Sequence, residues 1–115
     1  MPDRSCAYPT ETYGAILRIC LTSISTEFQS LLGNALKGKR QQVIIGTKGR
    51  WQTDPNPNAL GASRYHIINA VEASLQRLKT DYIDIYHLHG FDPRTALEDT
   101  LRTLDTLIRA GKIRY

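Results

Sequence analysis

The 115-residue sequence has only two cysteines and no long apolar run, and each deficit argues against a class of protein. Cys6 and Cys20 fit no metal-ligand spacing such as C-x₂-C, and the first residues, MPDRSCAYPTETYG, do not have the form of a secretory signal. Reduced thiols and a cytoplasmic location are therefore expected. A membrane-spanning helix needs roughly 20 apolar residues, and because no run approaches that length, no membrane partner is expected.

Several common motifs are also missing. The sequence has no G-x-G-x-x-G, no Walker motif and no G-x-S-x-G, which excludes the standard phosphate-binding loops and the nucleophile elbow. Its 15 Lys and Arg residues outnumber its 11 Asp and Glu residues, giving a net charge of +4. The basic cluster LKGKR at 36–40 has no interleaved aromatic residues, so we interpret it as the solvated end of a helix and expect no nucleic-acid partner.

From residue 25 onward, the sequence alternates between helical periodicity and short apolar or alternating runs. Ser63 is placed to cap the second predicted helix, and Thr95-x-x-Glu98 has the capping-box form at the start of the third. Helices are predicted over 26–37, 64–79 and 96–110, and extended segments over 42–47, 81–89 and 112–115.

Each predicted helix has a stripe of apolar residues that we expect to pack on the core. Asp84, within the second predicted strand, is expected to pair with a backbone or helix-face donor. The three helical stripes comprise Phe28, Leu31, Leu32 and Ala35; Ile67, Ile68, Val71, Leu75 and Leu78; and Leu97, Leu101, Leu104 and Ile108.

Strands that alternate with helices predict an α/β fold with a parallel sheet and right-handed crossovers, either open or closed as a barrel. A complete (β/α)₈ barrel takes about 250 residues, so a whole barrel is excluded. Residues 1–24 have no clear period and stay unassigned as an irregular N-terminal segment, with a weak strand or helix around 14–21. Residues 25–115 form the predicted domain.

Polar side chains follow the two predicted strands at the edge where α/β folds bind ligands. Lys48 directly follows the first strand, at a position where a lysine can lower the pKa of a neighbouring phenol or hold an anion; the alternative is a solvated lysine. His89 ends the second strand and can donate a hydrogen bond to a carbonyl or move a proton. Its alternative is a core histidine satisfied by backbone. Trp51, in the long loop after Lys48, either lines a substrate pocket or packs on the rim.

The histidines of the second strand also raise the possibility of a metal site. His87 and His89 form an H-x-H pair, which some metal-dependent hydrolases use to bind zinc. Zinc needs at least one further ligand, and the remaining histidine, His66, lies near the start of a helix. His87 is otherwise expected to be an interior spacer.

Three consecutive blocks of the sequence resemble the aldo-keto reductase family. They are LLGNALKGKRQQVIIGTK, GASRYHIINAVEASLQRLKTDYIDIYHLHG and DPRTALEDTLRTLDTLIRAGKIRY, in the family's order. The resemblance covers residues 31–115, about three quarters of the chain, and RLKTDYIDIYHLH is its most specific part.

The resemblance implies an incomplete (β/α)₈ TIM barrel from an enzyme that reduces aldehydes and ketones with NADP(H). The family's catalytic tetrad is Asp, Tyr, Lys and His. Tyrosine protonates the carbonyl oxygen, lysine lowers the tyrosine pKa, and histidine orients the carbonyl. Lys48 matches the tetrad lysine and His89 the tetrad histidine. Most of the cofactor-binding residues would lie beyond Tyr115.

The sequence departs from the family pattern at the other two tetrad positions. The tyrosine should fall near Ser23, and Tyr13 in ETYG lies about ten residues too early; the aspartate expected five residues before Tyr13 would fall on Tyr8. We therefore expect a fragment without activity of its own. Its unpaired strands invite non-specific self-association. A non-catalytic, subunit-interacting remnant and a metal-dependent hydrolase stay open as alternatives.

Overall fold

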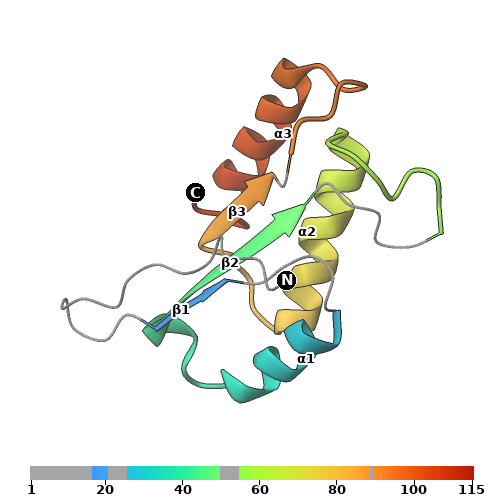
Figure 1. Cartoon of the computed structure of the whole chain (residues 1–115). Helices are drawn as coiled ribbons and strands as arrows, with labels where there is room; N and C mark the ends of the chain where they lie inside the picture. Colours follow the sequence, from blue (N-terminus) through green and yellow to red (C-terminus); the bar gives the residue numbers. More distant parts are fainter. Residues whose placement is uncertain (1–16, 21–25, 50–54, 89) are drawn as a thin grey trace.

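A computed structural model of the chain describes residues 17–20, 26–49, 55–88 and 90–115 (Figure 1). Strands and helices alternate along these residues, as the sequence predicts. The elements are β1 (Leu17–Cys20), α1 (Thr26–Ala35), the short 3₁₀ helix η2 (Arg40–Gln42), β2 (Val43–Gly49), α2 (Arg64–Leu78), β3 (Ile85–Leu88) and α3 (Leu97–Arg109).

The three strands form one parallel sheet in the order β1-β2-β3. The weak element expected around 14–21 is the strand β1. The extended segment expected from residue 112 is also present, because Ile113 pairs in parallel with Ile83 and the Tyr86 amide donates to the Tyr115 carbonyl at 2.8 Å. This topology confirms the predicted α/β class with parallel strands.

The core lies between the sheet and the helices α2 and α3 (Figure 1). Ile45 of β2 is fully buried, and so are Ile67 and Val71 of α2. Leu75 and Leu78 are buried as well, and Ile68 packs on the core while partly exposed. The predicted stripe of α2 is therefore confirmed.

The ends of the helices agree with the sequence in one case and differ in another. The Ser63 hydroxyl accepts a hydrogen bond from the His66 amide at 3.2 Å, as expected of a helix cap. The predicted cap at Thr95 is wrong, since Ala96 occupies the N-cap position of α3 without a side-chain cap. The Thr95 hydroxyl instead donates to the Asp92 carboxylate at 3.0 Å, because a buried carboxylate needs donors.

The stripe predicted for α3 is largely wrong. Leu97 and Leu101 are 53% and 54% exposed, whereas Thr100 and Thr103 are buried. Threonine can occupy this face because each hydroxyl finds a backbone acceptor, Ala62 O for Thr100 and Asp99 O for Thr103. The described residues place no other element over the leucines.

The stripe predicted for α1 is confirmed only at Leu32, which packs on the core while partly exposed. Phe28 and Leu31 are exposed, and the buried residues of α1 are Gln29 and Gly33. Gly33 lets α1 approach α2 so closely that a Cβ there would lie 2.6 Å from the Arg77 carbonyl oxygen. Gln29 then accepts a hydrogen bond from Arg77 Nε at 2.6 Å, which satisfies its buried amide.

A polar cluster fixes the amino-terminal edge of the sheet. The Asp84 carboxylate accepts hydrogen bonds from the Ile45 amide at 2.9 Å and from Arg40 Nη2 at 2.8 Å, which confirms the pairing expected for Asp84. The Tyr82 ring lies between the guanidinium groups of Arg40 and Arg114, 3.8 Å and 4.0 Å from its centroid. This cluster is structural, because it lies at the opposite end of the strands from Lys48.

No helix among the described residues is both long and apolar enough to cross a bilayer.

Candidate functional site

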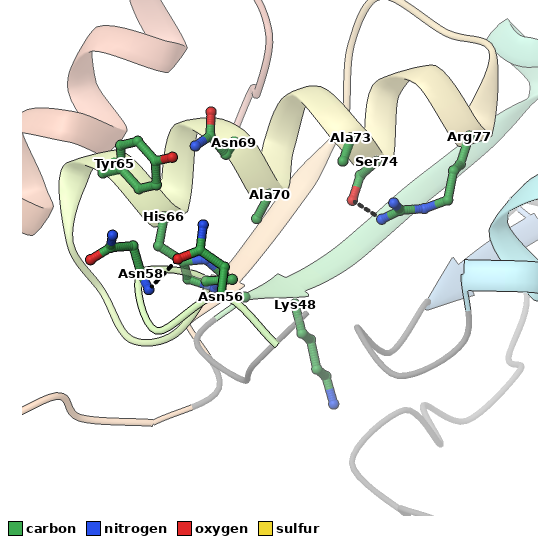
Figure 2. A pocket seen from close by; sticks show the side chains of 12 residues that line it. Lys48, Asn56, Asn58, Tyr65, His66, Asn69, Ala70, Ala73, Ser74 and Arg77 are labelled. Carbon is green, nitrogen blue, oxygen red and sulfur yellow. Dashed lines mark hydrogen bonds between the residues drawn. The ribbon is translucent and has the colours of Figure 1, made fainter. Parts of the chain in front are cut away.

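Lys48 lies at the carboxyl end of β2, where the buried run Val43–Thr47 gives way to the long loop. Its Cα pairs with that of His87 on β3, so both side chains leave the same face of the parallel sheet. A Cβ on Gly46 would lie 3.7 Å from His87 Nε2, which places this imidazole over Gly46 on the Lys48 face. Ile45 and Thr47 alternate with Lys48 and face α2. Figure 2 shows the Lys48 ammonium directed away from α2.

The structure thus places two of the residues singled out in the sequence side by side. Lys48 is half-buried at the strand end, as expected. His87 is exposed in this chain, not the interior spacer expected, because among the described residues no element covers that face. His89, Trp51 and Tyr13 lie outside the described residues, so their roles stay predictions.

Tyr86 cannot replace the missing tetrad tyrosine at Lys48. It pairs with Thr47 and therefore lies on the α2 face of the sheet, opposite Lys48. Its hydroxyl is buried against Gly49, where any side chain would overlap it, and has no hydrogen-bond partner among the described residues. Burial raises the pKa of Tyr86 to about 12, so its phenol stays protonated at neutral pH.

Asp92 joins the two loops that follow β2 and β3. Its carboxylate accepts hydrogen bonds from the Ala62 amide at 2.9 Å and the Arg94 amide at 3.0 Å, and these bonds hold the pKa of Asp92 down at about 2. The Thr100 hydroxyl of α3 donates to the Ala62 carbonyl. Both backbone polar groups of Ala62 are therefore bonded to side chains that follow β3 in the sequence. Gly61 has φ +93, and a Cβ there would lie 2.5 Å from the Asp92 carboxylate.

Sequence reasoning missed this connection. The segment GFDPR at 90–94 has the composition of a turn, and an Asp before Pro in a turn is a residue type that accepts backbone hydrogen bonds. Its partner Ala62 is 30 positions away, and no local pattern indicates it.

The hydrolase hypothesis needs a third ligand beside His87 and His89. Among the described residues, no three His, Cys, Asp or Glu side chains lie close enough together to hold a metal ion. His66 is buried in the first turn of α2, on the other side of the sheet from His87. The described part of the chain therefore gives this hypothesis no support.

Comparisons with known proteins cover most of the chain and not only this strand edge. A family model described as "Aldo/keto reductase family" matches residues 25–115. "Aldo-keto reductase YhdN" of Bacillus subtilis (strain 168) is 40% identical over 113 residues, covering 90% of this chain and 34% of the relative. A "Probable voltage-gated potassium channel subunit beta" of Arabidopsis thaliana is 36% identical over 86 residues, covering 72% of this chain and 26% of the relative.

A solved structure shares the arrangement of strands and helices. It is described as "aldo-keto reductase AKR11C1 from Bacillus halodurans (holo form)", with a TM-score of 0.75 and 33% sequence identity. The match covers 88% of this chain and 35% of that one. The chain spans about a third of the length of the first relatives it matches.

Proposed function

Since this chain belongs to the aldo/keto reductase family and supplies part of its barrel, we propose that it is part of an NADP(H)-dependent reductase of aldehydes and ketones. Lys48 and His89 are its proposed catalytic residues. The observation that carries this proposal is the parallel register of β2 and β3. It pairs Lys48 with His87, two positions before His89 in the sequence.

Each proposed residue has a distinct role. The Lys48 ammonium would favour the ionised form of a nearby phenol and so lower the pKa of the acid that protonates the carbonyl oxygen. His89 would donate a hydrogen bond that orients this oxygen, and Trp51 would line the substrate pocket. Since the sequence departs from the family pattern at the tyrosine and aspartate positions of the tetrad, we propose that the 115-residue chain alone does not turn over substrate.

The proposed cofactor, NADP(H), would supply the hydride. At the carboxyl ends of the described strands, Lys48 is the cationic side chain. The Tyr86 hydroxyl packs directly against Gly49 and fills the space beside its backbone. These residues do not form a cradle for a dinucleotide. Most contacts to the cofactor are thus proposed to lie outside the described residues, and none of the roles above depends on them.

NADPH binding and turnover test this proposal together. Titration of NADPH into the purified chain, followed by nicotinamide fluorescence, is expected to show weak, saturable binding that Lys48→Met reduces. The matched control is Lys37→Met, which removes the same charge from an exposed position after α1. With an aromatic aldehyde present, absorbance at the NADPH band is expected to stay constant.

Two outcomes would contradict it. Aldehyde reduction above the blank that Lys48→Met abolishes would show that the chain is active alone. No NADPH binding at any concentration would instead favour a non-catalytic, subunit-interacting role.

One comparison and one feature of the surface support that second role. A relative is described as a channel subunit, which is a protein that acts by assembling with another polypeptide. On this chain, apolar side chains of α1 and α3 are exposed, with Leu31 at 68%. Exposed apolar faces of this kind are typical of interaction surfaces.

A further inference from the structure

A cavity of about 330 Å³ lies on the α2 face of the sheet, away from the Lys48 ammonium (Figure 2). One wall is the side of α2 from Tyr65 to Arg77, and residues 56–59 and the end of β2 line the rest. Ala70 and Ala73 lie in the middle of the helical wall, where their small side chains leave the space open.

The charges around this cavity are all of one sign. Among the described residues, its lining contains Lys48 and Arg77 and no Asp or Glu. Since Figure 2 shows the Lys48 ammonium pointing away, Arg77 is the cation that faces the space. Small anions are therefore the complementary ligands.

Two hydrogen bonds link Arg77 to other residues in the part of the chain that the structure describes. Its Nε donates to Gln29 Oε1 at 2.6 Å and its Nη2 to Ser74 Oγ at 3.4 Å, whereas a guanidinium has five N–H donors. The side chain is half-buried, and burial lowers its pKa, yet no carboxylate among the described residues pairs with it. A partly desolvated guanidinium without a counter-ion can bind carboxylate or phosphate in a bidentate manner.

The far end of the cavity is polar and uncharged. Asn69 lies eight residues before Arg77 on α2, about 12 Å along the helix. Asn56 and Asn58 line the cavity from the loop, and the Asn58 backbone amide donates to Asn56 Oδ1 at 2.9 Å, which fixes the loop locally. Side-chain amides both donate and accept, so they suit hydroxyl groups.

We propose that this cavity binds a small phosphate- or carboxylate-bearing molecule, with the anion on Arg77 and hydroxyl groups on the asparagine end. Gln29 holds the guanidinium in place from α1, so the site needs α1 docked on α2. The end of β2 lines the cavity, but the anion position at Arg77 lies on the α2 face, away from the Lys48 ammonium, and the proposal does not depend on the reductase proposal.

Titration with inorganic phosphate at constant ionic strength, followed by ¹⁵N NMR, tests the site. The Arg77 Nε and the amides of Ser74 and Asn69 are expected to shift in a saturable way. Arg77→Gln should weaken the affinity by at least about tenfold, the loss expected for hydrogen bonds to a charged group. Arg64→Gln removes the same charge from an exposed position of α2 outside the cavity. This variant should change the phosphate affinity by less than about twofold.

A second variant keeps the experiment decisive if Arg77→Gln disturbs the packing of α1. Ala73→Leu fills the cavity from a half-exposed position and leaves Arg77 in place, so it should also abolish the shifts. A parallel titration with acetate distinguishes the two anions, since the stronger binder identifies the ligand class and either supports the site. Absence of saturable shifts, equal weakening by Arg64→Gln, or unchanged binding in folded Ala73→Leu would each overturn the proposal.

Discussion

Asp92 shows how one side chain can hold the loops at the carboxyl edge of the sheet. Its carboxylate accepts hydrogen bonds from the Ala62 and Arg94 amides and from the Thr95 hydroxyl. A protonated carboxyl group accepts such hydrogen bonds poorly, so protonation of Asp92 weakens the hydrogen bonds that join the two loops. The two loops should therefore separate when Asp92 gains a proton.

Acid unfolding tests this role. The pKa of Asp92 falls from 3.8 to about 2 on folding, so its contribution to stability is fully present above pH 3.8. That contribution is lost as the pH falls from 3.8 to about 2. Urea unfolding as a function of pH should show a decline over this interval that is shallower in Asp92→Asn. At neutral pH the variant should also be less stable.

The matched control is Asp105→Asn, which removes an exposed carboxylate paired with Arg109 on the surface of α3. It should change stability at neutral pH by less than about 1 kcal/mol. Equal effects of the two substitutions would contradict the role assigned to Asp92.

Tyr86 carries a second residue-scale prediction. Its buried hydroxyl has no hydrogen-bond partner among the described residues, so Tyr86→Phe should leave stability unchanged or raise it by about 1 kcal/mol. The pKa of Tyr86 rises from 10.0 to about 12 on folding, so the native chain should lose stability as the pH increases over that interval. Tyr86→Phe should reduce this loss, as measured by urea unfolding at alkaline pH. A clear destabilisation at neutral pH would show that the hydroxyl has a partner.

Single residues differ in how far the sequence could predict them. Lys48 could be placed because the β-branched run before it ends there and the strand direction follows from the helix–strand alternation. Asp92 and Gly61 could not, because their contact joins two loops and depends on how α3 sits beside α2. The exposed histidine at position 87 depends on what covers the sheet, which no local pattern determines.

At the scale of elements, the contact between α1 and α2 depends on one glycine. A Cβ at Gly33 would lie 2.6 Å from Arg77 O and 2.8 Å from Leu78 O, and backbone atoms cannot move aside locally. Gly33→Ala should therefore destabilise the chain by about 1–3 kcal/mol, in spite of the higher helix propensity of alanine. Thermal and urea unfolding would measure the change.

Gly46→Ala in β2 provides a control. A Cβ at Gly46 would meet its nearest atoms at 3.7 Å, an ordinary van der Waals distance. This substitution should be neutral or slightly stabilising, because alanine loses less backbone entropy on folding. A destabilisation as large as that of Gly33→Ala would mean that the close helix contact is not the cause.

The helices show which element-scale features a sequence determines. Helix positions follow from periodicity and from breakers such as Gly38 and Gly111, both of which have positive φ. The buried face of α2 was predictable because its apolar stripe is continuous. For α3 the apolar stripe and the buried face differ, since threonines with satisfied hydroxyls pack inward and Leu97 and Leu101 face outward.

At the scale of the whole molecule, the sheet has unpaired edges among the described residues. Among the described residues, β1 pairs with β2 alone, and the segment around Ile113 pairs only with residues 83–86 at the start of β3. Unpaired edges of parallel strands expose amide and carbonyl groups that other chains can bind. We therefore propose that the chain self-associates through these edges.

Sedimentation equilibrium checks this proposal. The apparent mass should rise above 13.0 kDa as the concentration increases. Leu101→Lys, which adds a charge to the exposed apolar face of α3, should leave the association unchanged. If this substitution abolishes association, the apolar face and not the sheet edge is responsible. A mass that stays at the monomer value would contradict association altogether.

The most direct test of the whole account is the distance between Lys48 and His89 in solution. Nuclear Overhauser effects between the Lys48 methylene protons and the His89 ring protons, in ¹³C-labelled chain, would report it. Since β2 and β3 are parallel and Lys48 is in register with His87, we predict a cross-peak between Lys48 and each histidine. Cross-peaks from Lys48 to His87 but none to His89 would contradict the proposed catalytic pair.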